Sequence, residues 1–205
     1  MGIARLLPLV LLLAPMLAHG KEAAAFKHTV AGAEVDWSAG TITAQAGSAA
    51  DIRMPGPNTA RPGAERRARA AAEEKLGAAL AIVAHGKKLD ERDALKHATV
   101  TRIEHQSDGG VVLWLALRFS DVIQAKPAAV ALKVTAMPLE FAPIIMVAGR
   151  EAQLGFATYR SAADGPRDAI HVERDDKGRL LVPAAAGGVD SLAGSAVVIY
   201  LEKAP

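Results

Sequence analysis

The chain has 205 residues, no cysteine, and 24 basic against 22 acidic side chains. The lack of cysteine excludes disulfide bonds, a thiol nucleophile and the lipid-bearing cysteine of a lipoprotein. A charge balance this close to neutral gives no electrostatic case for binding nucleic acid. The length suits one domain, or one domain with an elaboration.

The first twenty residues have the three parts of a secretory signal peptide. Arg5 is their one formally charged side chain, an apolar run covers residues 6–18, and Ala18-His19-Gly20 places small residues at both positions that a signal peptidase reads. We therefore expect cleavage before Lys21. The apolar run is too short for a membrane anchor, which needs about 20 apolar residues, so no transmembrane segment is expected after cleavage. The sequence predicts a periplasmic or secreted protein of the Gram-negative bacterial type.

Residues 21–33 are predicted to be a lead-in, and residues 34–205 a single α+β domain. A first hairpin is expected over residues 34–45, with its turn at 38–40, where Gly40 can take a left-handed conformation. Residues 47–63 contain three prolines and three glycines and predict a loop. A long helix is predicted from Ala64 to Ala84, because apolar residues recur there at helical spacing, and His85-Gly86 is expected to end it.

Strand patterns dominate the rest of the chain after a short helical turn at residues 90–96. A second hairpin is expected over 98–119 around the turn 107–110, and a third over 169–182 around 175–178. Single strands are expected at 130–135, 143–148 and 196–201. Together these elements predict an α+β fold in which an antiparallel sheet is covered by one long helix, followed by a strand-rich C-terminal half. Its core is expected to surround Trp37 and Trp114.

No motif in the sequence indicates catalysis. The histidines never occur at metal-ligand spacing, Gly-x-Ser-x-Gly is missing, and Asp175-Asp176-Lys177-Gly178 lacks the alternating oxygen ligands of a calcium loop. We therefore predict no catalytic residue, no metal ligand and no cofactor. One way to an enzyme stays open: a hydrolase whose histidine, carboxylate and serine meet only in the folded chain.

Four arginines at the start of the predicted helix are the candidate contact site: Arg61, Arg66, Arg67 and Arg69. Cations there oppose the helix dipole, at a cost of about 0.3–1 kcal/mol each. The functional interpretation is a site for an anion: a lipid headgroup, a polysaccharide or the acidic surface of a partner. The alternative, which we favour, is a solvated helix face on which Glu65 and Glu73 hold Arg69.

One stretch resembles a known bacterial envelope family. Val35-Asp36-Trp37, then Gly40-Thr41-Ile42-Thr43-Ala44, a loop, and an arginine- and alanine-rich helix follow the pattern of the family that includes the twenty-kilodalton outer-membrane lipoprotein antigen. The layout is also similar to that of the N-terminal module of flagellar outer-ring proteins. The matching residues are Asp36, Trp37, Gly40, Ile42 and Ala44 in the hairpin and Arg61, Ala64, Arg67, Ala68, Ala71 and Leu76 in the helix.

The resemblance covers roughly residues 33–120 and divides the domain into a family-like part, 34–120, and an extension, 121–205. It implies a small helix-on-sheet domain of the bacterial envelope without recognised catalytic residues. The lipid-bearing cysteine of the lipoproteins is missing here, so the resemblance does not extend to lipid anchoring. Residues 127–205 match no pattern of the family.

These observations lead us to expect a non-catalytic envelope protein that acts through protein or surface contacts, alone or in a larger envelope or flagellar-type assembly. Envelope protein partners are expected, although the sequence does not identify them. The alternative is a periplasmic module that binds an anionic ligand, either a lipid headgroup or a glycan. The hydrolase is the third hypothesis.

Overall fold

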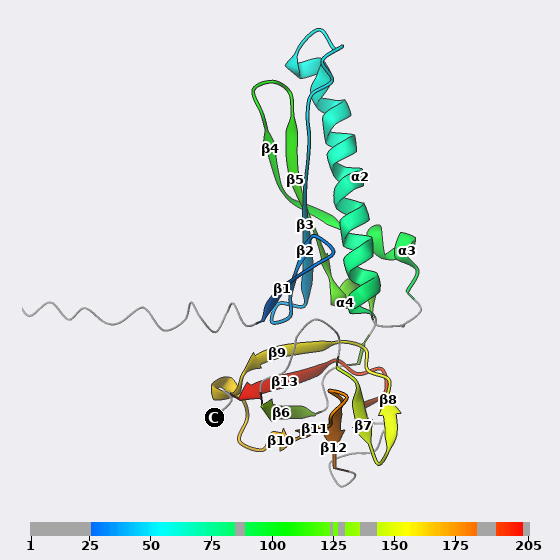
Figure 1. The fold of residues 1–205 in the computed structure, drawn as a ribbon, viewed down its shortest axis with the longest axis vertical. Coiled ribbons are helices and arrows are strands. Elements are labelled where there is room, and N and C mark those ends of the chain that lie inside the picture. The colour runs from blue at the N-terminus through cyan, green and yellow to red at the C-terminus, as the bar shows by residue number, and fades with distance from the viewer. Residues whose placement is uncertain are drawn as a thin grey trace, which may run out of the picture.

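The computed structural model describes residues 26–84, 89–123, 125–126, 130–135, 143–183 and 192–202. They form two lobes, an elongated one built from a sheet and a long helix and a rounder one built from strands (Figure 1). The expected α+β class is confirmed by this arrangement. The signal peptide, its cleavage before Lys21 and the helix stop at His85-Gly86 lie outside the described residues.

The helix–sheet lobe contains a five-stranded sheet that is antiparallel throughout. Its spatial order is β1-β2-β3-β5-β4. The strands are β1 (Lys27–Val30), β2 (Ala33–Asp36), β3 (Thr41–Ser48), β4 (Thr99–His105) and β5 (Val111–Arg118). The hairpins expected over 34–45 and 98–119 are confirmed as β2–β3 and β4–β5. Part of the predicted lead-in is β1, a four-residue edge strand too short to be recognised from alternation.

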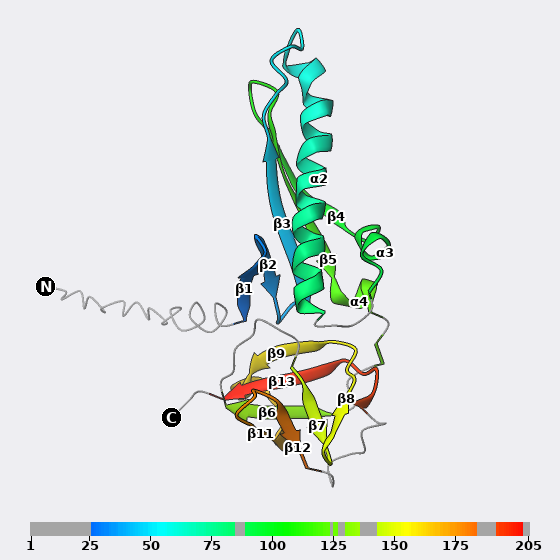
Figure 2. The ribbon, with the colours of Figure 1, turned by 45° about the vertical axis from the view of Figure 1, so that its right-hand side comes forward.

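The long helix α2 (Pro57–Val83) lies along one face of this sheet (Figure 2). It packs on β3 and β5, whose alternate residues are buried. Its buried stripe contains Ala60, Ala64, Ala68, Ala72 and Leu76. Alanine has a small side chain, so the helix backbone can approach the sheet closely.

The helix begins seven residues earlier than the predicted start at Ala64, so the expectation of a loop up to residue 63 is wrong. Pro57 occupies the first helical position, where a missing N–H costs nothing and the fixed φ suits a helix. Burial of Ala60 against the sheet, at 3 % exposure, extends the apolar stripe into the first turns and offsets the unfavourable Pro62. The prolines of residues 47–63 led to the prediction of a loop, although Pro57 and Pro62 both lie within α2.

Two short helices complete this lobe. Helix α3 (Glu91–Leu95) confirms the expected turn at 90–96, and the Asp90 carboxylate caps it by accepting from the backbone N–H groups of Arg92 and Asp93. Helix α4 (Phe119–Val122) follows β5 directly.

The C-terminal lobe contains two four-stranded sheets, ordered β10-β6-β13-β9 and β11-β12-β7-β8. The strands are β6 (Ala131–Thr135), β7 (Ile145–Val147), β8 (Arg150–Ala152), β9 (Ala157–Ser161), β10 (Ile170–His171), β11 (Glu173–Arg174), β12 (Leu180–Val182) and β13 (Val197–Glu202), with a short 3₁₀ turn at Ala162–Asp164. The strands expected at 130–135, 143–148 and 196–201 correspond to β6, β7 and β13.

Strand direction in this lobe differs from the expectation of antiparallel pairing. Strands β10 and β13 run parallel to β6, β9 runs parallel to β13, and β12 runs parallel to β7. Of the third predicted hairpin, only β11–β12 pairs as expected, because β10 instead joins β6. Periodicity identifies a strand but does not reveal its neighbour, so parallel pairing cannot be read from the pattern alone.

One hydrophobic core runs through both lobes, with members in α2, in β3 and β5, and in β6 and β13. Trp37 belongs to it, with 1 % of its surface exposed, as expected. Trp114 does not: it is half-buried on the sheet face opposite the helix, where the Arg102 guanidinium lies 4.7 Å from its ring centroid. The expectation that both tryptophans anchor the core is therefore half right.

Candidate binding surfaces

The four predicted arginines lie along the N-terminal half of α2, but two of them are engaged by the protein itself. Arg67 Nε donates to Ser48 Oγ at 3.0 Å and its Nη2 donates to the Ala49 carbonyl at 2.8 Å. Arg69 Nε forms an ion pair with Glu73 at 2.9 Å. Arg67 thus ties the loop after β3 to the helix. Of the two pairs predicted for Arg69, the pair with Glu73 is present, whereas Glu65 forms no ion pair among the described residues.

The other two arginines differ from these. Arg66 is exposed and forms no ion pair or hydrogen bond among the described residues. Arg61 is half-buried: its Nη1 lies 3.5 Å from the Asn58 side-chain oxygen, and its Nε is buried without a partner. Of the four arginines, Arg66 is therefore the one whose guanidinium is exposed and has no partner among the described residues.

The electrostatic reason for selecting these arginines changes with the helix start. Because α2 begins at Pro57, Arg61 lies at the fifth helical position and Arg66 at the tenth. The helix dipole acts within about the first turn, so it does not penalise Arg66, Arg67 or Arg69. The expectation that these three arginines oppose the helix dipole at a cost in stability is therefore wrong.

The loop between β3 and α2 carries a basic residue that the sequence analysis did not select. The Arg53 side chain donates to both oxygens of Asp51, at 3.1 Å each, and the Arg53 N–H donates to the same carboxylate at 3.0 Å. The hydrogen bond from the Arg53 side chain lowers the pKa of Asp51. Beside this pair, Ile52 is 97 % exposed and Met54 is 47 % exposed. No sequence pattern distinguishes an exposed Ile in a loop from a buried one.

Strand β4 is a second surface that the sequence did not indicate. All seven of its residues are exposed, although it belongs to a sheet with a buried face. Val100 and Ile103 lie opposite Leu115 and Leu113, which are buried. Cross-strand partners share a face, so both apolar side chains are on the helix side of the sheet but beyond the reach of α2.

The two lobes meet at an aromatic cluster formed by Trp37, Phe119, Phe156 and Tyr159. The Trp37 ring lies 5.5 Å from the Tyr159 ring in an edge-on arrangement and 5.8 Å from the Phe119 ring. The Tyr159 N–H donates to the Trp37 carbonyl across the junction at 3.3 Å. Burial raises the pKa of Tyr159 far above its ordinary value, and neither its hydroxyl nor Trp37 Nε1 has a hydrogen-bond partner among the described residues.

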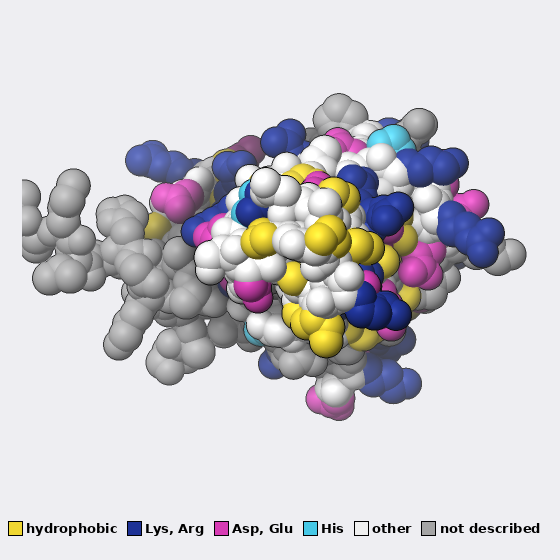
Figure 3. Space-filling model, turned by 90° about the horizontal axis from the view of Figure 1, so that it is seen from above, with side chains coloured by type: hydrophobic (Ala, Val, Ile, Leu, Met, Phe, Trp, Pro, Cys, Tyr) yellow, Lys and Arg dark blue, Asp and Glu magenta, His cyan; other side chains and the backbone are white. Residues whose placement is uncertain are grey.

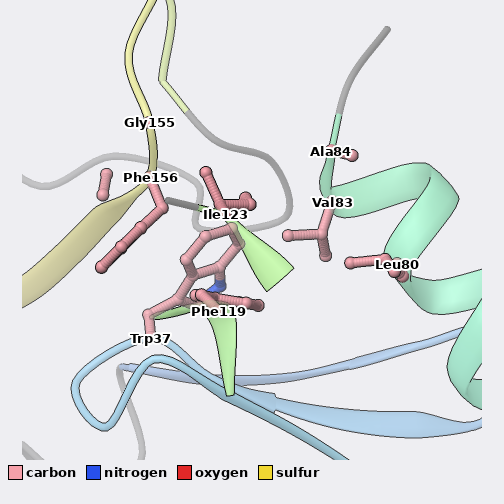
Figure 4. Close-up of a pocket in the computed structure, with 9 residues that line it drawn as sticks. Trp37, Leu80, Val83, Ala84, Phe119, Ile123, Gly155 and Phe156 are labelled. Atoms are coloured by element: carbon pink, nitrogen blue, oxygen red, sulfur yellow. The ribbon is translucent and has the colours of Figure 1, made fainter. Parts of the chain in front are cut away.

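A small apolar pocket adjoins this cluster (Figure 4). It is lined by Trp37, Leu80, Val83, Ala84, Phe119, Ile123, Gly155, Phe156 and Ala157. Its interior has room for about one water molecule, which is too little for a substrate or cofactor. The junction is therefore a packing contact between lobes.

The hydrolase hypothesis requires a histidine that meets both a carboxylate and a serine, and no described histidine has a hydrogen bond to a serine. His28 lies in β1, His97 after α3, His105 at the end of β4 and His171 in β10. His171 Nδ1 is 3.6 Å from Glu202, which also pairs with Lys133 at 2.8 Å and has its pKa lowered chiefly by that lysine. This is a solvent-exposed ion network. Among the residues that the structure describes, no group of three His, Cys, Asp or Glu is placed to hold a metal ion.

The chain matches no family model, no curated protein and no solved structure. The resemblance of residues 33–120 to the envelope family therefore stays a prediction from the sequence pattern. In the part of the chain that is described, no helix has the length and hydropathy needed to cross a membrane.

Proposed function

We propose that this chain is a non-enzymatic envelope protein that acts by binding another protein of its compartment. The N-terminal signal pattern supports the compartment, and the observation that carries the binding role is the exposed edge strand β4. The expected occupant of this edge is an extended segment of a partner protein, added to the sheet as a further strand.

The backbone of β4 supports strand addition. The Gln106 N–H donates to the Gly110 carbonyl at 2.8 Å, so in the alternation of an antiparallel ladder Glu104 also directs its backbone toward β5. Ile103 and His105 therefore direct their N–H and C=O groups away from β5, and no other described strand pairs with them. Open ladder groups of this kind bind an extended peptide through main-chain hydrogen bonds.

The side chains of β4 support the same role. Val100 is 45 % exposed and Ile103 is 37 % exposed, both on the side of the sheet that α2 covers elsewhere. A partner strand at this edge brings alternate side chains over the same face. Apolar residues there would bury Val100 and Ile103, so one bound segment satisfies the backbone and the exposed apolar surface together.

Site-specific photo-cross-linking in the bacterium that produces the protein tests this proposal. A photoreactive residue at position 103 is expected to give a covalent adduct with another envelope protein. The control is the same residue at Leu181, which is 41 % exposed in the C-terminal lobe. The absence of an adduct at 103, or equal adducts at both positions, contradicts the proposal. An adduct containing only this chain would replace the partner protein with a second copy.

A proline variant gives a sharper version of this test. Because the Ile103 N–H is directed away from β5, Ile103→Pro removes a donor that only an added strand uses. With the photoreactive residue moved to position 101, Ile103→Pro is expected to abolish the adduct while the thermal unfolding midpoint changes little. Ile103→Ala is the matched control, since it keeps the N–H.

The second candidate function is binding of an anionic ligand, and Arg66 favours it because its guanidinium is exposed and unpaired among the described residues. The chemistry available there is a charge-assisted hydrogen bond to a phosphate, sulfate or carboxylate oxygen.

A further inference from the structure

The far end of the helix–sheet lobe carries an exposed apolar tip, which we define as residues 51–57. It lies at the N-terminal end of α2, away from the C-terminal lobe (Figure 1). Ile52 is 97 % exposed and Met54 47 %, and Pro55 and Pro57 are also exposed. Figure 3 looks down on this end, where apolar side chains gather near the middle and both basic and acidic side chains lie around them. The tip is therefore convex, projecting and apolar at its centre.

The tip is held in one conformation by bonds inside and behind it. The Met54 N–H donates to the Asp51 carbonyl at 3.0 Å, closing a turn that places Ile52 and Arg53 at its corners. The Asp51 carboxylate accepts from the Arg53 backbone and side chain, which fixes the same turn. Arg67 ties the preceding residues to the helix. The turn itself thus exposes the Ile52 side chain, and the loop does not have to change conformation to expose it.

Basic side chains outnumber acidic ones around the tip, and the exposed carboxylates nearby are Asp108, in the adjacent β4–β5 turn, and Glu65 on α2. Asp51 is neutralised by Arg53, and the first turn of α2 contains no acidic residue. Arg66 follows on α2 with an exposed guanidinium that has no partner among the described residues, whereas Arg61 is half-buried and its Nε is buried. An anionic surface that contacts the tip is therefore close to basic residues of α2. Among the described residues of the tip, no unpaired carboxylate opposes this contact.

A lipid bilayer fits these features better than a protein partner does. A projecting apolar surface with basic residues next to it can enter the membrane–water interface. Its apolar side chains then lie at the acyl boundary and its arginines lie at the lipid phosphates. The apolar part of the tip consists of two large side chains and two prolines, which is far below the roughly 800 Å² that each partner buries in a standard protein interface. We propose that residues 51–57 dock the protein on an anionic bilayer surface, where Ile52 and Met54 enter the interface and Arg66 contacts lipid phosphates.

This inference goes beyond the proposed binding of a partner at β4, because the tip and β4 are different surfaces, and it names a lipid phosphate as the ligand of the second candidate function. Docking at the tip leaves the outward edge of β4 accessible to a partner strand. Loss of lipid binding would not remove the cross-link at position 103, and loss of that cross-link would not change lipid binding. The two proposals can therefore fail separately.

Co-sedimentation of the full mature chain with lipid vesicles tests the inference. Binding is expected to vesicles of phosphatidylcholine mixed with phosphatidylglycerol, and to weaken strongly on vesicles of phosphatidylcholine alone. Ile52→Asp is expected to lower the partition coefficient by about tenfold or more, because an Ile side chain no longer leaves water. Leu181→Asp, at a similarly apolar exposed site in the other lobe, is expected to leave binding unchanged. Arg66→Gln is expected to weaken binding to the anionic vesicles about fivefold, since each basic residue near such a surface contributes about 1 kcal/mol.

A fluorescent variant gives an independent measurement. In Ile52→Trp the new indole is expected to shift its emission to shorter wavelength when anionic vesicles are added, relative to the parent chain with Trp37 and Trp114 alone. The inference is overturned if the wild-type chain does not sediment with anionic vesicles, if Ile52→Asp and Leu181→Asp bind equally, or if the emission of the Ile52→Trp variant does not move. Equal binding to both vesicle types would overturn the role of Arg66.

Discussion

Asp36 organises the tight turn between β2 and β3. Its Oδ1 accepts hydrogen bonds from the backbone N–H groups of Ser38 and Ala39, at 3.0 and 2.9 Å, and from the Ser38 hydroxyl at 2.7 Å. Burial alone would raise the pKa of Asp36, but these hydrogen bonds and the nearby Lys27 ammonium outweigh it and lower the pKa below its ordinary value of 3.8. The folded state therefore favours the ionised carboxylate.

The consequence is a pH-dependent contribution to stability. A carboxylate with a lowered folded-state pKa stabilises the fold above its unfolded pKa, and this contribution is lost as pH falls through the folded pKa. Asp36→Asn is expected to lower the free energy of unfolding by about 1 kcal/mol near neutral pH, and by less at an acidic pH well below 3.8. Urea unfolding at both pH values measures the difference, with Asp176→Asn in an exposed turn as the control. If Asp36→Asn loses the same unfolding free energy at both pH values, the charge of Asp36 has no role in stability.

Tyr159 presents the opposite case, a buried polar group without a partner among the described residues. Its ring packs edge-on against Trp37 while its hydroxyl is buried and unbonded. Tyr159→Phe removes only the hydroxyl, so the free energy of unfolding is expected to stay unchanged or to rise by up to about 1 kcal/mol. Tyr159→Leu removes the ring contacts as well and is expected to be clearly destabilising. Denaturant unfolding separates the two; a loss of more than about 1 kcal/mol in Tyr159→Phe would show that the hydroxyl is satisfied.

At the scale of the element, turn residues predicted structure better than strand residues did. Gly40, Gly109 and Gly178 lie at the predicted turns, and each has a positive φ, so the hairpins around them could be placed in advance. Strand β8 was missed because three residues show no measurable alternation, and β10 was expected as part of the third hairpin although it pairs with β6. The early start of α2 was missed because burial of Ala60 depends on a sheet that the local sequence does not contain.

Gly109 links two elements at the tip end of the lobe. It lies in the β4–β5 turn with φ +94°, and a Cβ added there would be 2.8 Å from the Pro57 carbonyl oxygen and 2.9 Å from the Pro57 Cα. The hairpin turn thus packs directly against the first residue of α2. Gly178 lies in the β11–β12 turn with a similar φ of +77°, but an added Cβ meets nothing within 4 Å.

These two glycines form a matched pair of variants. Gly178→Ala is expected to cost about 1–2 kcal/mol, from the backbone conformation alone. Gly109→Ala is expected to cost clearly more, because the helix start and the hairpin must also move apart. Denaturant unfolding of both variants gives the comparison. Equal losses would mean that the contact between Gly109 and Pro57 relaxes freely and does not fix the tip.

The candidate surfaces were less predictable than the elements, for a physical reason. Whether Arg67 is free depends on Ser48 and Ala49, which lie 19 and 18 residues away in the chain and approach only in the fold. The exposure of Ile52 depends on where α2 begins, and the exposure of β4 depends on how far α2 reaches across the sheet. Residue type indicated that arginines are available for contacts, but spatial arrangement decides which of them are free.

At the scale of the whole molecule, the two lobes share one core. The aromatic cluster joins Trp37 and Phe119 of the helix–sheet lobe to Phe156 and Tyr159 of the C-terminal lobe, with ring centroids 5.5–6.2 Å apart. A hydrogen bond crosses the same junction. A shared core of this kind favours unfolding as one cooperative unit, because opening the junction exposes large apolar rings on both sides.

Cooperativity can be tested because the aromatic reporters are divided between the lobes. Both tryptophans lie in the helix–sheet lobe and both tyrosines in the C-terminal lobe. Ile199→Ala removes a fully buried side chain from β13 and is expected to cost about 2–5 kcal/mol. If the lobes unfold together, tryptophan fluorescence follows this loss, and its denaturant midpoint falls by as much as that of the tyrosine signal. A tryptophan midpoint that stays at the wild-type value would mean that the lobes unfold independently. Phe156→Ala, which removes one ring from the junction, is then expected to separate the two midpoints in the Ile199→Ala background, because it weakens the contact through which the loss is transmitted.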